Sequence, residues 1–335
     1  MCSSLQLAAL CLAIALPACT GGDTTSAGGG GSGAVGAGTA GWGAGGGAGG
    51  AGSGAGGHGA GGAGGGSTPA PLRLALIGDF GDDSSEEAAV AALVAGWSPD
   101  FVVTLGDNNY PAGTAATIDA SIGQYYQAFI GNYAGAYGAG SVANRFFPCP
   151  GNHDWMAAGL APYLDYFTLP GNERYYEVDF GLVRLFALDS DSHEPDGATA
   201  SSVQAGWAES RIEASPACWD LVVFHHAAYS SSAAHGSTTR MRWAFEAWGA
   251  DAVFGGHDHT YERLAVGGIP YFVNGIGGAG LYAFGTPIAE SVARYNDRHG
   301  AMLATATVSD LTFELYSDDG VLQDSHVVQK NCLSP

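Results

Sequence analysis

The sequence predicts an α/β domain in which two mixed β-sheets pack together and are flanked by helices. Short apolar runs bounded by Gly or Asp alternate with helical stretches through the middle of the chain. The last part of the chain turns to β-rich runs that succeed one another closely. Strand–helix alternation is typical of parallel pairing, and a terminal series of strands adds antiparallel pairing, so a mixed architecture is expected.

The chain divides by composition before any strand is assigned. Residues 5–16 form an apolar run of signal-peptide length that is too short to span a bilayer. The segment 16–19 that follows resembles a bacterial lipobox, so we predict a lipoprotein-type signal peptide over 1–18 and a lipid on Cys19. An ordinary secretory signal is the alternative. In both cases the protein is exported, either as an outer-membrane or cell-surface lipoprotein or in periplasmic or secreted form.

Two further regions follow the signal. Residues 19–70 consist mainly of Gly, Ala and Ser and offer almost nothing apolar to bury, which predicts a disordered tether. Residues 71–335 have a globular, aromatic-rich composition, and their length suits one large catalytic domain with a well-buried core.

The strongly acidic balance limits the classes of partner. The formal net charge is −21, with 11 Lys and Arg against 32 Asp and Glu. Nucleic acid binding needs a basic surface, so a nucleic acid partner is excluded. A phosphate substrate must then be attracted by local metal charge rather than by the field of the whole protein.

Three cysteines belong to the predicted domain: Cys149, Cys218 and Cys332. In an oxidising compartment one pair can form a disulfide. We favour Cys218 with Cys332, because Cys149 lies in a predicted strand and resembles a small buried hydrophobe. Sequence alone leaves the pairing open.

The first strand–helix–strand unit is the clearest element. Strands are predicted at 72–77 and 101–105, with a helix over 84–96 between them. Ser84 can cap the beginning of this helix and Gly96 its end. Such a unit predicts parallel pairing with a right-handed crossover.

The remaining elements follow the same reading. Helices are predicted at 118–130, 201–213 and 238–248. Strands are predicted at 145–149, 174–180, 182–189, 219–224, 251–254, 270–274, 301–308, 311–316 and 321–328. The runs at 174–180 and 182–189 flank Gly181 and form a hairpin, and the last runs form a terminal meander.

Polar clusters follow several of the predicted strands, at the edge of an α/β sheet where ligands bind. The clusters are Gly78-Asp79-Phe80-Gly81, Gly106-Asp107-Asn108-Asn109-Tyr110, Gly151-Asn152-His153-Asp154, Val222-Val223-Phe224-His225 and Gly256-His257-Asp258-His259. Singly, most are ambiguous, since an Asp after a strand is usually a turn former. Together they supply enough oxygen and imidazole ligands for two adjacent metal ions.

This ordered set resembles the purple acid phosphatases, within the calcineurin-like metallophosphoesterases. Their signature is DxG, GDxxY, GNH[DE], VxxH and GHxH, and each motif is matched without substitution. The resemblance implies a metallophosphoesterase-type four-layer sandwich. It also implies hydrolysis of phosphomonoesters in acid by attack of a metal-bound hydroxide at a binuclear Fe(III)–M(II) centre.

The same resemblance assigns ligands to each metal. The first metal takes Asp79, Asp107, Tyr110 and His259. The second metal takes Asp107, Asn152, His225 and His257. Hard anionic oxygens predominate in the first set and neutral nitrogens in the second, which favours Fe(III) in the first site and Fe(II), Zn(II) or Mn(II) in the second.

Two further histidines are the predicted catalytic residues. By resemblance, His153 and His235 contact the phosphate or the leaving group, although His153 can instead be a hydrogen-bonding support and His235 an exposed loop residue. Neighbouring side chains of a strand point to opposite faces, so only one of His225 and His226 should enter the site. His226 is then an outer or pocket residue.

Other residues near the motifs have weaker assignments. Asp154 and Asp189 can orient ligand histidines or serve as ordinary caps and turns, and we read 260–263 as structural support for the last motif. His193, His299 and His326 are expected to be surface or core residues.

Two competing functions remain open at this stage. A phosphodiesterase would use the same two metals, and a non-catalytic surface lipoprotein would use the same scaffold. For the leading reading we expect a small phosphoester substrate, membrane attachment through a lipidated Cys19, and no nucleic acid or protein partner.

Overall fold

The computed structural model describes residues 69–332. The predictions for the signal peptide, for Cys19 and for most of the tether lie outside this range. Among the described residues, no helix combines the length and apolar character needed to cross a membrane.

Parallel and antiparallel strands meet in the first sheet, whose order is β13-β12-β11-β1-β2-β3. Its strands are β1 (Leu72–Ile77), β2 (Phe101–Thr104), β3 (Phe146–Pro148), β11 (Gly300–Ala306), β12 (Asp310–Ser317) and β13 (Leu322–Gln329). β1, β2 and β3 pair in parallel, whereas β11, β12 and β13 form the predicted antiparallel meander. The predicted pairing of 72–77 with 101–105 is therefore confirmed.

The second sheet has seven strands in the order β10-β8-β9-β7-β6-β5-β4. They are β4 (Tyr176–Asp179), β5 (Val183–Ala187), β6 (Trp219–His226), β7 (Ala252–Gly256), β8 (Tyr261–Val266), β9 (Ile269–Asn274) and β10 (Ser291–Tyr295). β4 and β5 form the predicted hairpin, and β5, β6, β7 and β9 are parallel. The sequence reading missed β8 and β10.

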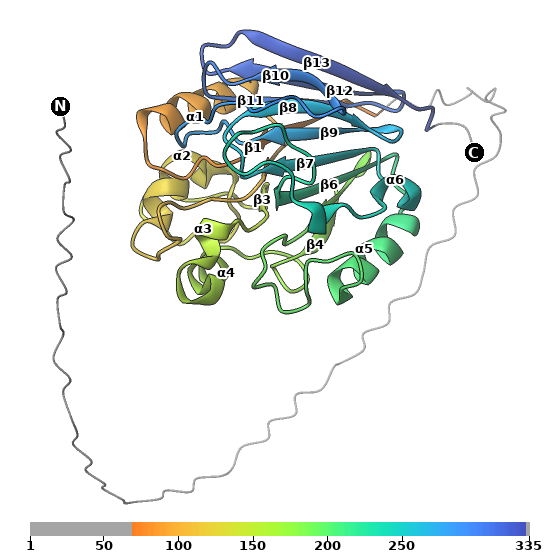
Figure 1. Cartoon of the computed structure of the whole chain (residues 1–335). Coiled ribbons are helices and arrows are strands. Elements are labelled where there is room, and N and C mark those ends of the chain that lie inside the picture. The colour runs from red at the N-terminus through yellow and green to blue at the C-terminus, as the bar shows by residue number, and fades with distance from the viewer. Residues whose placement is uncertain (1–68, 333–335) are drawn as a thin grey trace, which may run out of the picture. The chain divides into compact units, whose positions relative to one another are not determined.

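The two sheets pack face to face over one apolar core (Figure 1). The ring of Phe313 on β12 lies 5.4 Å from Phe254 and 4.9 Å from Phe272, which belong to the second sheet. Contacts of this kind across the interface bury the inner faces of both sheets. The predicted arrangement of two mixed sheets with flanking helices is confirmed.

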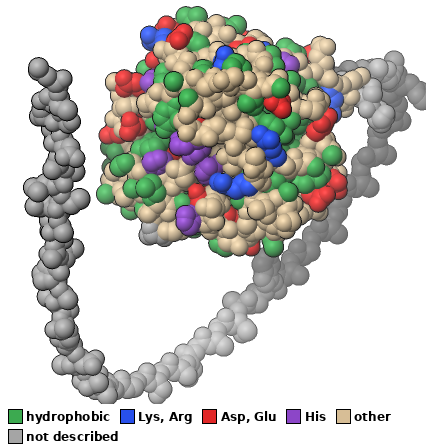
Figure 2. Space-filling model, viewed as in Figure 1, with side chains coloured by type: hydrophobic (Ala, Val, Ile, Leu, Met, Phe, Trp, Pro, Cys, Tyr) green, Lys and Arg blue, Asp and Glu red, His purple; other side chains and the backbone are tan. Residues whose placement is uncertain are grey.

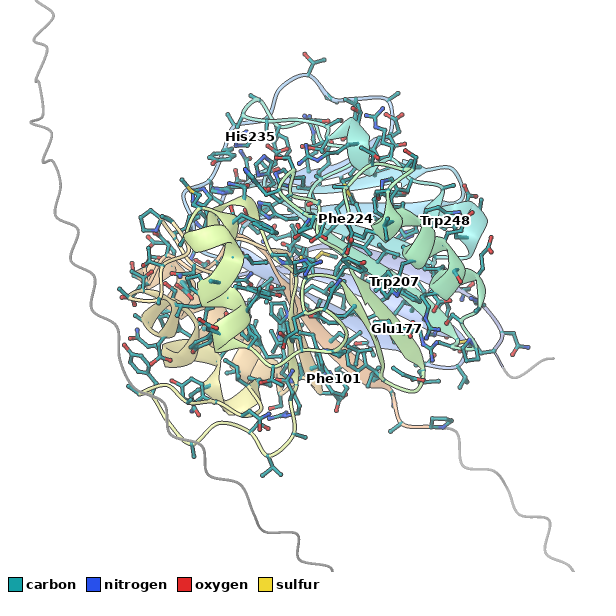
Figure 3. All side chains as sticks on the ribbon, turned by 90° about the horizontal axis from the view of Figure 1, so that it is seen from below. Phe101, Glu177, Trp207, Phe224, His235 and Trp248 are labelled. Atoms are coloured by element: carbon teal, nitrogen blue, oxygen red, sulfur yellow. A yellow bond between two sulfur atoms is a disulfide. The ribbon has the colours of Figure 1, made fainter. Side chains whose placement is uncertain are left out.

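The outer face of the second sheet is covered by α5 (Val203–Glu213) and α6 (Phe245–Trp248). Trp207, Phe224 and Trp248 come from α5, β6 and α6 and lie on this side of the sheet (Figure 3). α1 (Ser85–Trp97) and the segment around α2 (Gln124–Tyr126) lie beside the first sheet (Figure 1). Helices therefore flank both sheets.

Several helix predictions need correction. Ser84 caps α1 as predicted, but the helix runs past Gly96, and Ser98 takes the left-handed terminal conformation with φ 52°. The predicted helix at 118–130 is a series of short π, α and 3₁₀ turns over 119–129. The predicted helix at 238–248 is broken into a 3₁₀ turn at Thr239–Met241 and α6.

The break in this last helix has a packing cause. Between its two pieces the buried Trp243 donates its indole N–H to the carbonyl of Arg240 and packs against Phe245. The burial of Trp243 in the core interrupts the helix that the spacing of apolar residues predicted over 238–248. The sequence reading also missed three short helices: α3 (Asn152–Trp155), a 3₁₀ turn (Ala158–Leu160) and α4 (Ala161–Tyr166).

The parallel strands bring the polar clusters together. β1, β2 and β3 end at one edge of the first sheet, and β6 and β7 end at the facing edge of the second. In the surface view, histidines gather on one face (Figure 2). His235 lies on the opposite side of the described domain from Phe101, which begins β2 (Figure 3). The candidate site therefore lies at the carboxyl ends of these strands.

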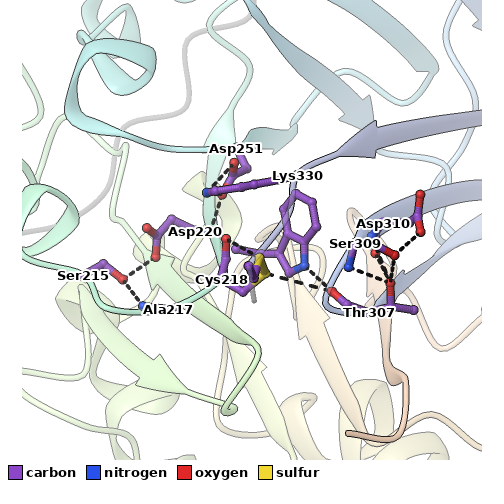
Figure 4. The surroundings of a disulfide bond; sticks show 11 residues. Ser215, Ala217, Cys218, Asp220, Asp251, Thr307, Ser309, Asp310 and Lys330 are labelled. Carbon is purple, nitrogen blue, oxygen red and sulfur yellow. Dashed lines mark hydrogen bonds and ion pairs between the residues drawn. A yellow bond between two sulfur atoms is a disulfide. The ribbon is translucent and has the colours of Figure 1, made fainter. Parts of the chain in front are cut away.

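A disulfide joins Cys218 to Cys332, as predicted, and Cys149 is free and buried. It ties the residue before β6 to the end of the described chain, across a sequence separation of 114. Around it, Lys330 pairs with Asp251 at 3.0 Å, and Trp219 donates its indole N–H to the carbonyl of Thr307 (Figure 4). The C-terminal segment is thereby attached to the second sheet.

Removing this disulfide should destabilise the domain. A Cys218→Ser/Cys332→Ser double variant should lose about 2–4 kcal/mol of unfolding free energy, because the unfolded chain is no longer closed into a long loop. Urea unfolding of the full chain measures this. Reductant should shift the wild type to the variant's midpoint and leave the variant unchanged; equal midpoints without reductant would contradict the prediction.

Candidate metal centre

Three of the predicted ligands have an uncommon backbone conformation. Asp79, Asp107 and His257 each follow a strand closely and have positive φ angles of 55°, 52° and 69°. Asp and His tolerate this left-handed region better than most residues, but it still costs free energy that the surroundings must supply. All three side chains contribute to one cluster.

Glycines next to these residues allow the loops to approach closely. A Cβ on Gly106 would lie 2.6 Å from the imidazole Nδ1 of His225. A Cβ on Gly151 would overlap the backbone and carboxylate of Asp107. The glycines of the GD and GNH motifs are thus required by contact between loops that are distant in the sequence.

One group of donor atoms surrounds the phenol oxygen of Tyr110. This oxygen lies 3.0 Å from Asp107 Oδ2, 3.3 Å from Asp79 Oδ1 and 3.2 Å from His259 Nε2. His259 Nε2 and Asp79 Oδ1 are 3.4 Å apart. The structure therefore brings together all four residues predicted for the first metal.

A second group surrounds the imidazole of His225. Its Nε2 lies 3.0 Å from Asn152 Oδ1, 3.2 Å from His257 Nδ1 and 3.3 Å from Asp107 Oδ2. These are the four residues predicted for the second metal. Asp107, 2% exposed, belongs to both groups and occupies the position of a bridge.

The donor set fits cations in these positions. His225 Nδ1 lies 2.9 Å from the carbonyl of Leu105, and His259 Nδ1 lies 2.8 Å from the carbonyl of Gly280. These carbonyls accept the single N–H of each neutral ring, so each Nε2 presents a lone pair to the carboxylate oxygens. Lone pairs that face one another at these distances repel unless a cation lies between them. Asp107, His225 and His257 each offer one ligand atom, and these three atoms lie within 4.8 Å of one another, close enough to share one cation.

The electrostatics of the cluster agree with this. Burial disfavours a charged His225, but the carboxylates of Asp107 and Asp79 outweigh burial and raise its pKa to about 10. Burial and the charges of His225 and His235 lower the pKa of His257 to about 2. A proton on His225 and a metal ion are thus alternative ways to satisfy the same attraction, and the Nε2 lone pair becomes available to a metal when the ring is neutral.

The carboxylates of Asp79 and Asp107 also favour the protonated form of Tyr110. Burial, followed by the charges of Asp79 and Asp107, raises the pKa of Tyr110 well above its usual value. The phenol therefore stays protonated in this environment unless a strong cation compensates the added negative charge.

The two predicted catalytic histidines flank the cluster. His153 Nδ1 lies 2.6 Å from the carbonyl of Pro111, its ring lies 4.4 Å from Tyr110, and its Nε2 lies 3.9 Å from Asp107 Oδ2. His235 is exposed, and its ring lies 4.1 Å from that of His257 (Figure 3). Both rings are at the surface of the site, where a substrate can reach them.

The structure adds a residue that the sequence reading missed. The ring of Tyr282 stacks on His259 with centroids 4.0 Å apart, and it lies 5.7 Å from His235. Tyr282 belongs to a loop after β9 that bears no motif. Its backbone N–H donates to the carbonyl of His259, and its own carbonyl accepts the side-chain N–H of Asn296. These tertiary contacts left no signal in the sequence.

The expectation that His225 and His226 point to opposite faces of β6 is not met, because their ring centroids lie only 5.0 Å apart and both rings lie close to His257. The pairing of β6 with β7 is irregular between Val223 and His226, so the simple alternation of the strand does not hold here. His226 bonds through Nδ1 to Ser190 Oγ at 2.9 Å, and its ring is 4.4 Å from His257. It is therefore a buried residue beside the cluster.

The supporting residues also have defined contacts. Asp154 accepts backbone N–H bonds from Gly151 and Asn108, so it acts as a cap that joins two motifs. Asp189 accepts the indole N–H of Trp155. In segment 260–263, Glu262 is buried and accepts two bonds from Ser231, which agrees with structural support. His193 is exposed, and His299 and His326 are half-buried outside the cluster.

Comparison with known proteins now identifies the family. The family model for calcineurin-like phosphoesterases matches residues 72–261, which hold all the motifs. The chain belongs to the calcineurin-like phosphoesterase family. Its curated relatives include two Arabidopsis thaliana proteins, purple acid phosphatases 17 and 4. The first is 26% identical over 77% of this chain and 84% of its own length, and the second is 27% identical over 73% and 80%.

Solved structures show the same fold. The yellow lupin purple acid phosphatase PPD1 aligns with a TM-score of 0.64 and 17% identity, over 79% of this chain. This chain spans only 55% of the lupin protein. GAP50 of Plasmodium, the anchor in the inner membrane complex, aligns with a TM-score of 0.61 and 16% identity, over 78% of this chain and 90% of its own.

The contact between the GNH and GD loops yields a test. Gly151→Ala should weaken metal binding about tenfold or more, because the added methyl group displaces Asp107. Titration of the metal-free full chain with Zn(II), followed by calorimetry, measures the affinity. Gly206→Ala on α5 is the control, since its Cβ meets nothing within 4 Å. Equal affinities in the wild type and both variants would contradict the prediction that the contact between Gly151 and Asp107 positions the metal ligands.

Proposed function

We propose that this protein is an exported acid phosphatase that hydrolyses phosphomonoesters at a binuclear Fe(III)–M(II) centre, where M is Fe(II), Zn(II) or Mn(II). The supporting observation is the convergence of two donor groups on the shared carboxylate of Asp107. A pair of cations held by one bridging carboxylate is the arrangement that two-metal phosphoester hydrolysis requires.

In this proposal the first cation is held by the group around Tyr110 and the second by the group around His225. When bound, the cations would activate a water molecule and neutralise the charge of the phosphoryl group. Two carboxylates and a phenol suit a hard trivalent ion, whereas an amide and two imidazoles suit a divalent one.

The side chains of this protein supply the remaining functions. His153 and His235 lie on two sides of the cluster and can donate N–H bonds to phosphoryl oxygens or a proton to the departing alkoxide. The carbonyl of Pro111 fixes the ring of His153, so its Nε2 faces the cluster. Tyr282 covers His259 and limits the access of solvent from that side.

Export is part of the proposal. The Cys218–Cys332 disulfide supports an oxidising compartment, and the apolar run at 5–16 supports a signal peptide, with attachment to a membrane through a lipidated Cys19. The substrate is a small phosphoester, and the acidic surface argues against a nucleic acid.

The fold alone does not decide whether such a protein is an enzyme, because a similar fold occurs in the GAP50 anchor. Catalysis is supported here by the residues themselves, since every predicted ligand is present in the cluster. A protein that only used the scaffold would have no need for the strained backbone at Asp79, Asp107 and His257.

The iron assignment depends on Tyr110. Phenolate bound to Fe(III) gives a visible charge-transfer band, so the purified protein should be coloured and Tyr110→Phe should lose the band. A visible spectrum with metal analysis of both proteins tests this. A colourless wild type that contains no iron yet hydrolyses p-nitrophenyl phosphate would refute Fe(III) and leave the phosphatase proposal standing.

The bridging role of Asp107 makes a second test. Asp107→Asn should lower kcat for p-nitrophenyl phosphate at least a thousand-fold, roughly the scale of lost transition-state stabilisation expected for an essential group. Asp324→Asn, at a partly buried ion-pair partner of Arg263 outside the donor cluster, is the control and should keep activity. Full activity in Asp107→Asn would refute the site, and faster turnover of bis(p-nitrophenyl) phosphate than of the monoester would favour a phosphodiesterase.

A further inference from the structure

Most basic side chains of this acidic protein are held by carboxylates. The paired residues are Arg174, Arg184, Arg211, Arg263, Arg298 and Lys330. Within residues 69–332, no carboxylate lies at ion-pair distance from Arg73, Arg145, Arg240, Arg242 or Arg294. Acidic residues are in large excess, so an arginine without a carboxylate partner beside the candidate site keeps its positive charge available to a ligand.

Arg240 is the unpaired arginine that contacts the surroundings of the metal centre. Its Nε and Nη2 donate to the carbonyl of Ser190 at 3.0 and 2.8 Å. The hydroxyl of Ser190 bonds to His226, whose ring lies 4.4 Å from that of His257. Arg240 is thus linked to the donor cluster through two buried residues, by way of the backbone carbonyl and hydroxyl of Ser190 and the ring of His226. In Figure 2 Lys or Arg side chains lie beside the histidines.

The guanidinium of Arg240 keeps unused hydrogen-bonding capacity. A guanidinium carries five N–H donors, and the bonds to Ser190 use Nε and one N–H of Nη2. No other acceptor for this side chain is found among residues 69–332. The residue is partly exposed, so the remaining donors are available to a ligand. The Ser190 carbonyl holds the side chain in place, which lowers the entropic cost of binding an anion.

The same part of the site carries aromatic surface. Trp155 donates its indole N–H to Asp189, the residue before Ser190, and its ring stacks on the exposed imidazole of His193 with centroids 6.0 Å apart. The segment 189–193 follows β5, which lies next to β6 in the sheet. Trp155 and Arg240 are thus bonded to adjacent residues of this segment, and His193 stacks on Trp155; we call these three residues the β5 wall.

The chemistry of the β5 wall suits an organic group with a negative charge. Flat rings give contact area, and a guanidinium forms paired, charge-assisted hydrogen bonds with a carboxylate or a phosphate. The net charge of −21 repels multiply charged anions, so a substrate of this kind needs a fixed local cation in addition to the metals.

We propose that Arg240 binds a second anionic group on the leaving group of the substrate, so that the site prefers phosphomonoesters carrying a carboxylate or another phosphate over those with a neutral leaving group. This inference rests on the proposed function, because it concerns the leaving group of the same reaction.

The test compares two substrates with the same carbon skeleton, using the metal-loaded full chain. 3-Phosphoglycerate carries a carboxylate where glycerol 3-phosphate carries a neutral hydroxymethyl group. Arg240→Gln should lower kcat/KM for 3-phosphoglycerate about tenfold or more, mainly through KM, and change that for glycerol 3-phosphate less than about twofold. Arg240→Lys should recover part of the loss. Arg242→Gln, an exposed unpaired arginine of the same segment, is the matched control and should behave as the wild type.

The outcomes distinguish two roles of Arg240: binding the second anionic group of the substrate, and holding the segment around Ser190 in place. Equal losses for both substrates would mean that Arg240 only holds the Ser190 segment, and no loss for either would mean that it does not meet the substrate; both results overturn the inference. If the wild type hydrolyses neither substrate, the proposed function fails, and calorimetric titration with 3-phosphoglycerate then decides. Tenfold weaker binding by Arg240→Gln than by the wild type would support the inference, and equal binding would overturn it.

Discussion

The repulsion among buried donor atoms around Asp107 is the constraint on which this architecture depends. Carboxylate, phenol, amide and imidazole groups from loops far apart in the sequence lie within about one hydrogen-bond length of one another. Such a cluster is unfavourable by itself, because burial removes the water that would solvate each group. The two sheets force the loops into contact through their packed inner faces, and the resulting field binds positive charge.

The location of the cluster follows from topology, whereas its geometry follows from local backbone turns. Parallel strands of both sheets present their carboxyl ends at facing edges, and this could be read from the strand–helix alternation. The seven predicted ligands converge because the motifs occupy these ends. The left-handed turns at Asp79, Asp107 and His257 also aim the side chains, and only the Gly residues beside them hinted at this in the sequence.

Sequence reading failed where packing or a single contact decides the structure. The helix expected at 238–248 is interrupted because Trp243 fills the core, a choice that periodicity does not encode. Tyr282 reaches the site from a loop without a motif, and Arg240, in the broken helix, bonds to Ser190 next to it. These two residues were invisible to motif analysis because their positions depend on tertiary contacts alone, and substrate preference is the property that such contacts control.

The disulfide also divides the donor set in an informative way. Residues 218–332 form one covalent ring in the oxidised chain, and that ring contains His225, His257 and His259. Every oxygen donor of the centre lies earlier in the chain, outside the ring. The disulfide therefore keeps the nitrogen donors within one closed loop of the unfolded chain, which lowers the entropy lost when they come together.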